Sequence, residues 1–127
     1  MAYAIKTKRI YEEPDEADGY RVLVDRMWPR GVSKERAALD DWAKQIAPSK
    51  ELCEWFGHKA ERYLDFQGKY NDELDENSNA PAFVKKIDEE LKAGRQVTLL
   101  YAAKSKMYNN TIALEEWLNY AVEDLDR

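Results

Sequence analysis

The stretch VLVDRMWPRG (residues 22–31) joins an apolar run directly to a charged segment that ends in glycine. The unbroken apolar core Val22–Val24 is typical of a strand buried on both faces, as in a parallel sheet. We therefore assign residues 20–25 to a strand that ends at Asp25, with Arg26 immediately after it. Residues 96–102, Gln-Val-Thr-Leu-Leu-Tyr-Ala, form an equally clear strand near the other end of the chain, and Lys104 follows it closely.

Helical periodicity between these strands predicts an α/β fold, a small and mostly parallel sheet of three to four strands flanked by helices, with α+β as the alternative. Residues 3–11 alternate loosely and predict a first strand. Residues 39–46 keep a helical spacing, although their first four residues also suit a fourth strand. The other predicted helices are a short one with Leu52, Trp55 and Phe56 on its apolar face, which ends at Gly57, and longer ones over residues 59–75, 81–93 and 110–125. The last of these is capped by Asn109 or Asn110.

The composition fits one soluble domain over residues 1–127, long enough to bury a core. No apolar run approaches the roughly 20 residues of a membrane helix, and the N-terminus lacks the apolar core of a signal peptide. We therefore expect a cytoplasmic protein with no membrane partner. The net charge of −5 argues against nucleic acid as a partner. One cysteine and one histidine argue against a disulfide or a zinc site, and the sequence predicts no cofactor and no metal.

Six residues that follow the two clear strands form the candidate ligand site. If the strands are parallel neighbours, their carboxyl ends meet at one edge of the sheet, where open α/β sheets bind ligands. The last predicted helix would direct its N-terminal amides toward the same crevice. Cationic side chains and backbone donors suit a phosphate, sulfate or carboxylate group, so the predicted partner is a small anionic molecule. The predicted ligand-binding residues are Asp25, Arg26, Trp28, Arg30, Lys104 and Asn109.

Other interpretations of the same residues stay open. The charged pair after the first clear strand also suits a structural role in holding loops, with Trp28 as a wall of the core. A small hydrolase or a phosphoryl- or sulfur-transfer enzyme would use Ser105 or Tyr108 as its hydroxyl and Asp25 or His58 as its base, but no spacing supports a pairing. An interaction module would use the apolar stripe of the last helix, for instance in a homodimer.

Three further features have plain structural interpretations. Cys53 lies next to Trp55 on an apolar helix face, which predicts a buried and inert thiol. His58 follows a glycine at a helix end and suits a capping or packing role. The acidic residues between Glu12 and Asp18 form a loop with proline and glycine, which predicts a solvated segment.

The chain resembles the domain-of-unknown-function 488 family, in its short YeaO-like branch. The resemblance is carried by Asp25–Gly31, by Trp42–Ser49 with the residues after it, and by Val97–Lys104 leading to Asn109 and Asn110. It implies a small cytoplasmic α/β protein and no established activity. This chain has Tyr108 where relatives often have histidine, and it has no cysteine in the loop after the last strand. The strand-and-loop layout is similar to rhodanese, but the missing thiol argues against sulfur transfer.

Overall fold

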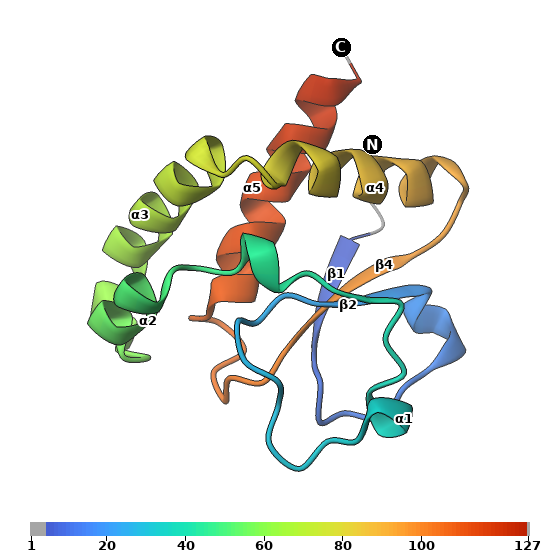
Figure 1. Ribbon diagram of the computed structural model, residues 1–127, viewed down its shortest axis with the longest axis horizontal. Helices are drawn as coiled ribbons and strands as arrows, with labels where there is room; N and C mark the ends of the chain where they lie inside the picture. The colour runs from blue at the N-terminus through green and yellow to red at the C-terminus, as the bar shows by residue number, and fades with distance from the viewer. Residues whose placement is uncertain (1–4, 127) are drawn as a thin grey trace.

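The computed structural model describes residues 5–126, which form a parallel four-stranded sheet and five α-helices (Figure 1). The strands lie in the order β1-β4-β2-β3, and every neighbouring pair is parallel. This arrangement confirms the predicted α/β fold. The strand bounds are β1 Ile5–Arg9, β2 Tyr20–Leu23, β3 Asp41–Trp42 and β4 Val97–Tyr101.

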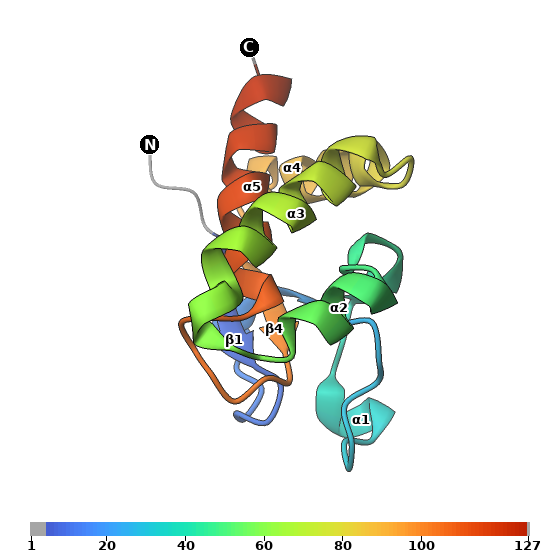
Figure 2. The ribbon, with the colours of Figure 1, turned by 90° about the vertical axis from the view of Figure 1, so that its left-hand side faces the viewer.

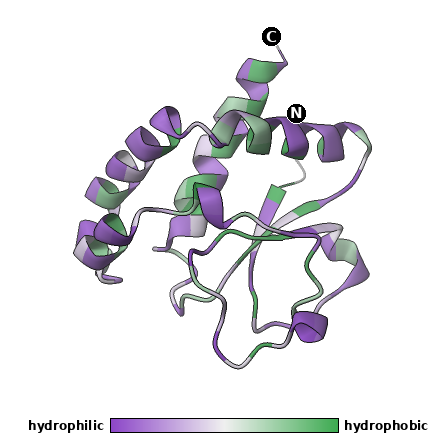
Figure 3. Ribbon diagram, viewed as in Figure 1, coloured by the Kyte–Doolittle hydropathy of each residue, from purple (hydrophilic) through white to green (hydrophobic). Residues whose placement is uncertain are grey.

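Side-chain caps start three of the helices, because a polar side chain before the first turn accepts from its free N–H groups. Ser33, Ser49 and Asn109 make these caps. No helix between residues 5 and 126 combines the length and apolar character of a membrane span. Hydrophobic and hydrophilic residues alternate along the longer helices, as expected where one side packs on a core (Figure 3). The helix bounds are α1 Lys34–Ala37, α2 Lys50–Phe56, α3 Tyr63–Glu76, α4 Ala80–Lys92 and α5 Asn110–Leu125.

The two faces of the sheet have separate hydrophobic cores, because successive side chains of a strand point to opposite faces. Val22 and Leu99 belong to the larger core, which α2, α3, α4 and α5 cover. Figure 2 shows α2 and α3 on the same side of the molecule. Leu23 and Leu100 belong to the smaller core, which the segment from Trp28 to Leu39, including α1, covers.

The chain leaves β2 and β4 toward opposite faces of the sheet. The segment after β2 runs over the smaller core, whereas the segment after β4 leads into α5 on the larger core. Adjacent parallel strands whose connections separate in this way leave a crevice at their carboxyl ends. Both loops lie in the lower half of the view in Figure 1. The topology therefore places an opening beside the charged residues that end β2.

Two sequence predictions about secondary structure need correction. Residues 39–46 are not one helix, because Asp41–Trp42 pairs with Val22 and Leu23 as strand β3 and a 3₁₀ turn follows over Lys44–Ile46. The alternative of a fourth strand is the one the structure has. The first strand covers Ile5–Arg9 of the predicted residues 3–11, of which residues 3 and 4 lie outside the described residues.

The acidic loop before β2 is only partly solvated, which corrects the sequence interpretation. Asp18 is 1% exposed, and its carboxylate accepts from Arg21 at 2.5 Å and from Lys8 at 3.0 Å. Arg21 is also buried and donates to the carbonyl oxygens of Ala37 and Ala38 at 2.8 and 3.1 Å. This ion-pair cluster connects β1, β2 and the end of α1.

Candidate functional site

The ends of β2 and β4 lie side by side, in the relation that the sequence predicts. Leu23 is in register with Leu100, and the Asp25 carboxylate accepts from the Ala102 backbone N–H at 2.8 Å. The second oxygen of this carboxylate accepts from the Asn110 side-chain amide at 3.2 Å. One aspartate therefore joins the end of β2 to the end of β4 and to the start of α5.

A groove of about 1100 Å³ opens at this edge of the sheet, and all six predicted ligand-binding residues line it. We call it the strand-end groove. The sequence reasoning missed its apolar side, which α2, α3 and the loop before α2 supply. The additional lining residues that matter below are Met27, Pro29, Pro48, Lys50, Cys53, Glu54, Phe56, His58, Phe66 and Ser105.

The groove carries more cationic than acidic side chains, although the whole chain has a net charge of −5. Arg26, Arg30, Lys50 and Lys104 are exposed along it. Within residues 5–126, no hydrogen bond or ion pair involves any of these four side chains. The acids that line the groove are Glu54 and the already hydrogen-bonded Asp25. The groove is therefore locally cationic, although the chain as a whole is acidic.

Burial raises the pKa of Asp25 above its ordinary value, while the hydrogen bonds from Ala102 and Asn110 oppose this shift by favouring the charged form. Through these bonds the Asp25 carboxylate links the ends of β2 and β4. Arg26, the next residue, is exposed and has no such bond in the described part of the chain. Asp25 therefore holds together the strand ends that form the groove, whereas the Arg26 side chain is exposed to solvent.

Replacing Asp25 with alanine should lower the free energy of unfolding by about 1–3 kcal/mol, because the Ala102 N–H loses its acceptor in a partly buried place. Urea unfolding at neutral pH measures the change. Glu54→Ala is the matched control, since the side chain of this groove acid makes no hydrogen bond or ion pair among the described residues. Equal losses of unfolding free energy in the two variants would contradict a stabilising role of the Asp25–Ala102 hydrogen bond.

Two of the predicted ligand-binding side chains also have structural partners. The Trp28 indole N–H donates to the Val32 carbonyl at 2.7 Å, and its ring contacts Trp42 edge-on at 5.3 Å. The Asn109 side-chain oxygen accepts from the N–H groups of Thr111 and Ile112 at 2.8 and 3.0 Å. These two N-terminal amides of α5 are therefore capped by the chain itself, contrary to the expectation that they would face a ligand.

The hydroxyl and base candidates of the enzyme interpretation are not paired. Ser105 lines the groove, but its hydroxyl oxygen accepts from the backbone N–H groups of Met107 and Tyr108. No hydrogen bond among residues 5–126 joins Ser105 to Asp25 or His58. The Tyr108 ring instead contacts the Tyr63 ring at 5.4 Å. Nor does any group of three metal-ligating side chains occur in the described residues.

The prediction of a buried Cys53 is wrong, because its residue is exposed and lines the groove. Partial burial of the thiol raises its pKa, an effect that the charge of Arg26 opposes. His58 also lines the groove, at a backbone φ of +58° directly after Gly57. Gly57, in the left-handed conformation, ends α2 and turns the chain. In the sequence, a glycine followed by histidine was therefore the one feature that could have indicated that His58 lines the groove.

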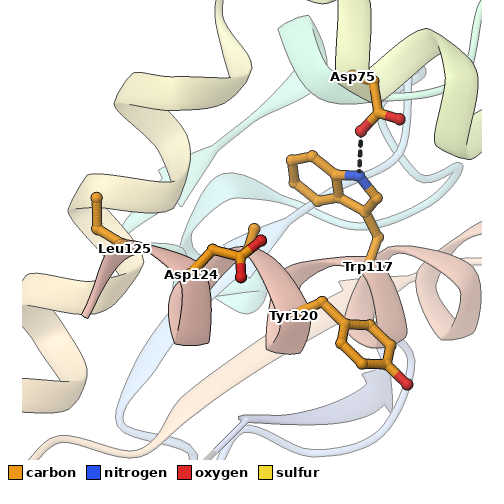
Figure 4. A pocket seen from close by; sticks show the side chains of 6 residues that line it. Asp75, Trp117, Tyr120, Asp124 and Leu125 are labelled. Atoms are coloured by element: carbon orange, nitrogen blue, oxygen red, sulfur yellow. Dashed lines mark hydrogen bonds between the residues drawn. The ribbon is translucent and has the colours of Figure 1, made fainter. Parts of the chain in front are cut away.

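A second hollow, of about 580 Å³, lies on the C-terminal half of α5. Figure 4 shows Trp117 directed toward Asp75, to which its indole N–H donates at 3.0 Å, and Tyr120 pointing away from that pair. Leu118 and Val122, on the other side of α5, are buried in the core of the same chain. Most of the predicted interaction stripe is thus used within the chain, and a homodimer stays a prediction.

The fold and the groove define a small α/β protein with a cationic crevice at the carboxyl ends of two parallel strands. The chain belongs to the domain-of-unknown-function 488 family: the profile described as "Inactive DUF488-N3 subclade" matches residues 4–127. It is 39% identical to the uncharacterized protein YeaO of Escherichia coli (strain K12) over 90% of this chain and 96% of the relative. It is also 39% identical to the uncharacterized protein Rv3073c of Mycobacterium tuberculosis, over 91% and 93%. No solved structure matches the chain.

Proposed function

We propose that this protein binds a small molecule bearing a phosphate, sulfate or carboxylate group in the strand-end groove. The observation that carries the proposal is the set of exposed cations there that have no partner within residues 5–126. A guanidinium presents a planar fork that fits two oxygens of an anion at once, and an ammonium adds a mobile charge. In this proposal Arg26 and Arg30 hold the anionic group, and Lys104 approaches it from the end of β4.

The proposal is binding without turnover. The hydroxyl of Ser105 is engaged by two backbone N–H groups and has no base within hydrogen-bond distance among the described residues. The word "inactive" in the description of the matching subclade agrees with this interpretation. A single cysteine suits a reducing compartment, so we place the protein in the cytoplasm as part of the proposal.

Replacing Arg26 with alanine should weaken the binding of inorganic phosphate or sulfate by about 1–3 kcal/mol, because a charge-assisted hydrogen bond is lost. Isothermal titration calorimetry of the wild type and the variant measures the difference. Lys104→Ala should weaken binding in the same direction, whereas Lys85→Ala, an exposed lysine on α4 outside the groove, should leave it unchanged.

Salt should weaken the interaction as well, since exposed charges are screened by added ions. Phosphate affinity that is equal in the wild type, Arg26→Ala and Lys104→Ala would show that the groove is not the anion site. Affinity lost equally in Lys85→Ala would indicate a general effect of surface charge.

A further inference from the structure

We infer that the ligand of the strand-end groove is amphipathic: an oxyanion attached to a flat apolar body that lies on the α2–α3 side. This inference rests on the proposed function and specifies the chemistry of the same site. A bare inorganic anion would use the cations and leave the rest of the groove in contact with water. The size of the groove, its apolar lining and an exposed methionine favour a larger, partly apolar molecule, and its cations favour an anionic group.

The volume is the first argument. Sites for small organic ligands and cofactors occupy about 300–1000 Å³. The strand-end groove, at about 1100 Å³, lies slightly above that range and far exceeds the needs of one phosphate ion. Arg26, Arg30 and Lys104 lie on the loops after β2 and β4, whereas the opposite side, which comes from α2 and α3, carries one cation, Lys50. A ligand that contacts both walls must extend beyond its anionic group.

The apolar wall is the second argument. Phe56 and Phe66 line the groove with rings stacked at 4.3 Å and 21°, and both are nearly buried. Pro29 and Pro48 are further apolar lining residues. Core packing holds these side chains and leaves little of their surface exposed, so they form a rigid apolar floor under the groove that needs no ordering when a ligand binds. Preformed apolar walls with a few polar anchors are typical of sites for organic molecules.

The third argument is an exposed methionine at the mouth of the groove. Met27 is 74% exposed between Arg26 and Trp28, so an apolar side chain is held in water beside the cations. Methionine is flexible and polarizable, and exposed methionines are common on surfaces that adapt to apolar ligands. A ligand body that reaches past the cations would remove this side chain from water.

The cationic side chains of the groove determine the charge of the ligand's polar group. Arginine and lysine only donate hydrogen bonds, so Arg26, Arg30 and Lys104 select an acceptor and favour an anion over a cation or a neutral donor. Asp25 already accepts from two partners and so adds little demand for a ligand donor. An aryl or similarly flat apolar acid, as a phosphate or carboxylate, combines both requirements.

Three probes test the inference with this chain: 2-naphthyl phosphate, inorganic phosphate and 2-naphthol. We expect 2-naphthyl phosphate to bind at least about tenfold more tightly than inorganic phosphate, because its ring system leaves water on binding. We expect 2-naphthol to bind far more weakly than its phosphate ester. Isothermal titration calorimetry measures all three affinities.

Met27→Ser and Met107→Ser form a matched pair, since the two side chains are 74% and 67% exposed and only Met27 lines the groove. We expect Met27→Ser to weaken 2-naphthyl phosphate severalfold and to leave inorganic phosphate unchanged, with no effect of Met107→Ser. Because both positions are exposed, neither variant should impair folding.

The outcomes separate the inference from the proposed function. Equal affinity for 2-naphthyl phosphate and inorganic phosphate, both reduced by Arg26→Ala, would overturn the amphipathic ligand and keep the anion site. Binding of 2-naphthol as tight as that of its phosphate ester would overturn both, because the groove would then select apolar bodies without regard to charge. Absence of binding by all three probes would also overturn both.

Discussion

Replacing Asp18 with alanine is expected to lower the free energy of unfolding by about 3–5 kcal/mol, because it leaves a buried guanidinium without its counter-ion. Asp18 is 1% exposed and Arg21 is 4% exposed, and they are joined at 2.5 Å. Lys8 completes the cluster from β1. Urea unfolding of the two proteins at neutral pH measures the loss.

Glu16→Ala is the control for this change, since Glu16 is an exposed acid in the same turn whose side chain makes no hydrogen bond or ion pair among the described residues. Its replacement should change the free energy of unfolding by less than about 0.5 kcal/mol. A loss in Asp18→Ala no larger than that in Glu16→Ala would contradict the buried cluster.

The same carboxylate predicts a loss of stability in acid. Burial raises the pKa of Asp18, but hydrogen bonds from Lys8, the Asp15 backbone N–H and Arg21 together hold it below its ordinary value. Its contribution to stability is therefore fully present above the unfolded-state pKa of about 3.9 and is lost as the pH falls through the lower folded-state value. The stability difference between wild type and Asp18→Asn should shrink across that interval.

How far the sequence predicts the structure depends on the range of the interactions. The neighbouring strand ends follow from two strongly apolar segments, since buried parallel strands of a small sheet must lie close together. Cap and turn residues such as Asn109 act within a few positions and are legible as a local pattern. These short-range rules were enough to place Asp25, Arg26 and Lys104 at one edge of the sheet.

Contacts between residues far apart in the chain could not be predicted from the sequence. Asp18 looks like one acid among several, and its burial depends on Lys8 in another strand. Residues 39–46 fit a helical spacing, but pairing of Trp42 with Leu23 and its indole bond to the Asp25 carbonyl at 2.8 Å outweigh that local preference. Cys53 faces the groove because α2 packs against α3, which no spacing within α2 reveals.

Gly19 is the position at which one methyl group should disrupt the strand pair that forms the groove. It has φ +64° and ψ −123°, a conformation that is costly for any residue with a Cβ. A Cβ there would lie 2.1 Å from the backbone oxygen of Gln96. That same oxygen accepts from the Tyr20 N–H at 2.7 Å, so the contact occurs where β2 first meets β4.

Gly19→Ala is therefore expected to lower the free energy of unfolding by about 3 kcal/mol or more. Backbone strain and a steric clash both contribute, and the clash is with backbone atoms, which cannot move away as a flexible side chain could. Gly94→Ala separates the two causes, since Gly94 has φ +82° with no atom within 4 Å of an added Cβ. That control should lose only about 1–2 kcal/mol through strain. Equal losses in the two variants would mean that the close approach to Gln96 has no energetic weight. A larger loss in Gly19→Ala, with phosphate affinity reduced in the folded fraction, would show that the start of this strand pair fixes the spacing of the cations at its far end.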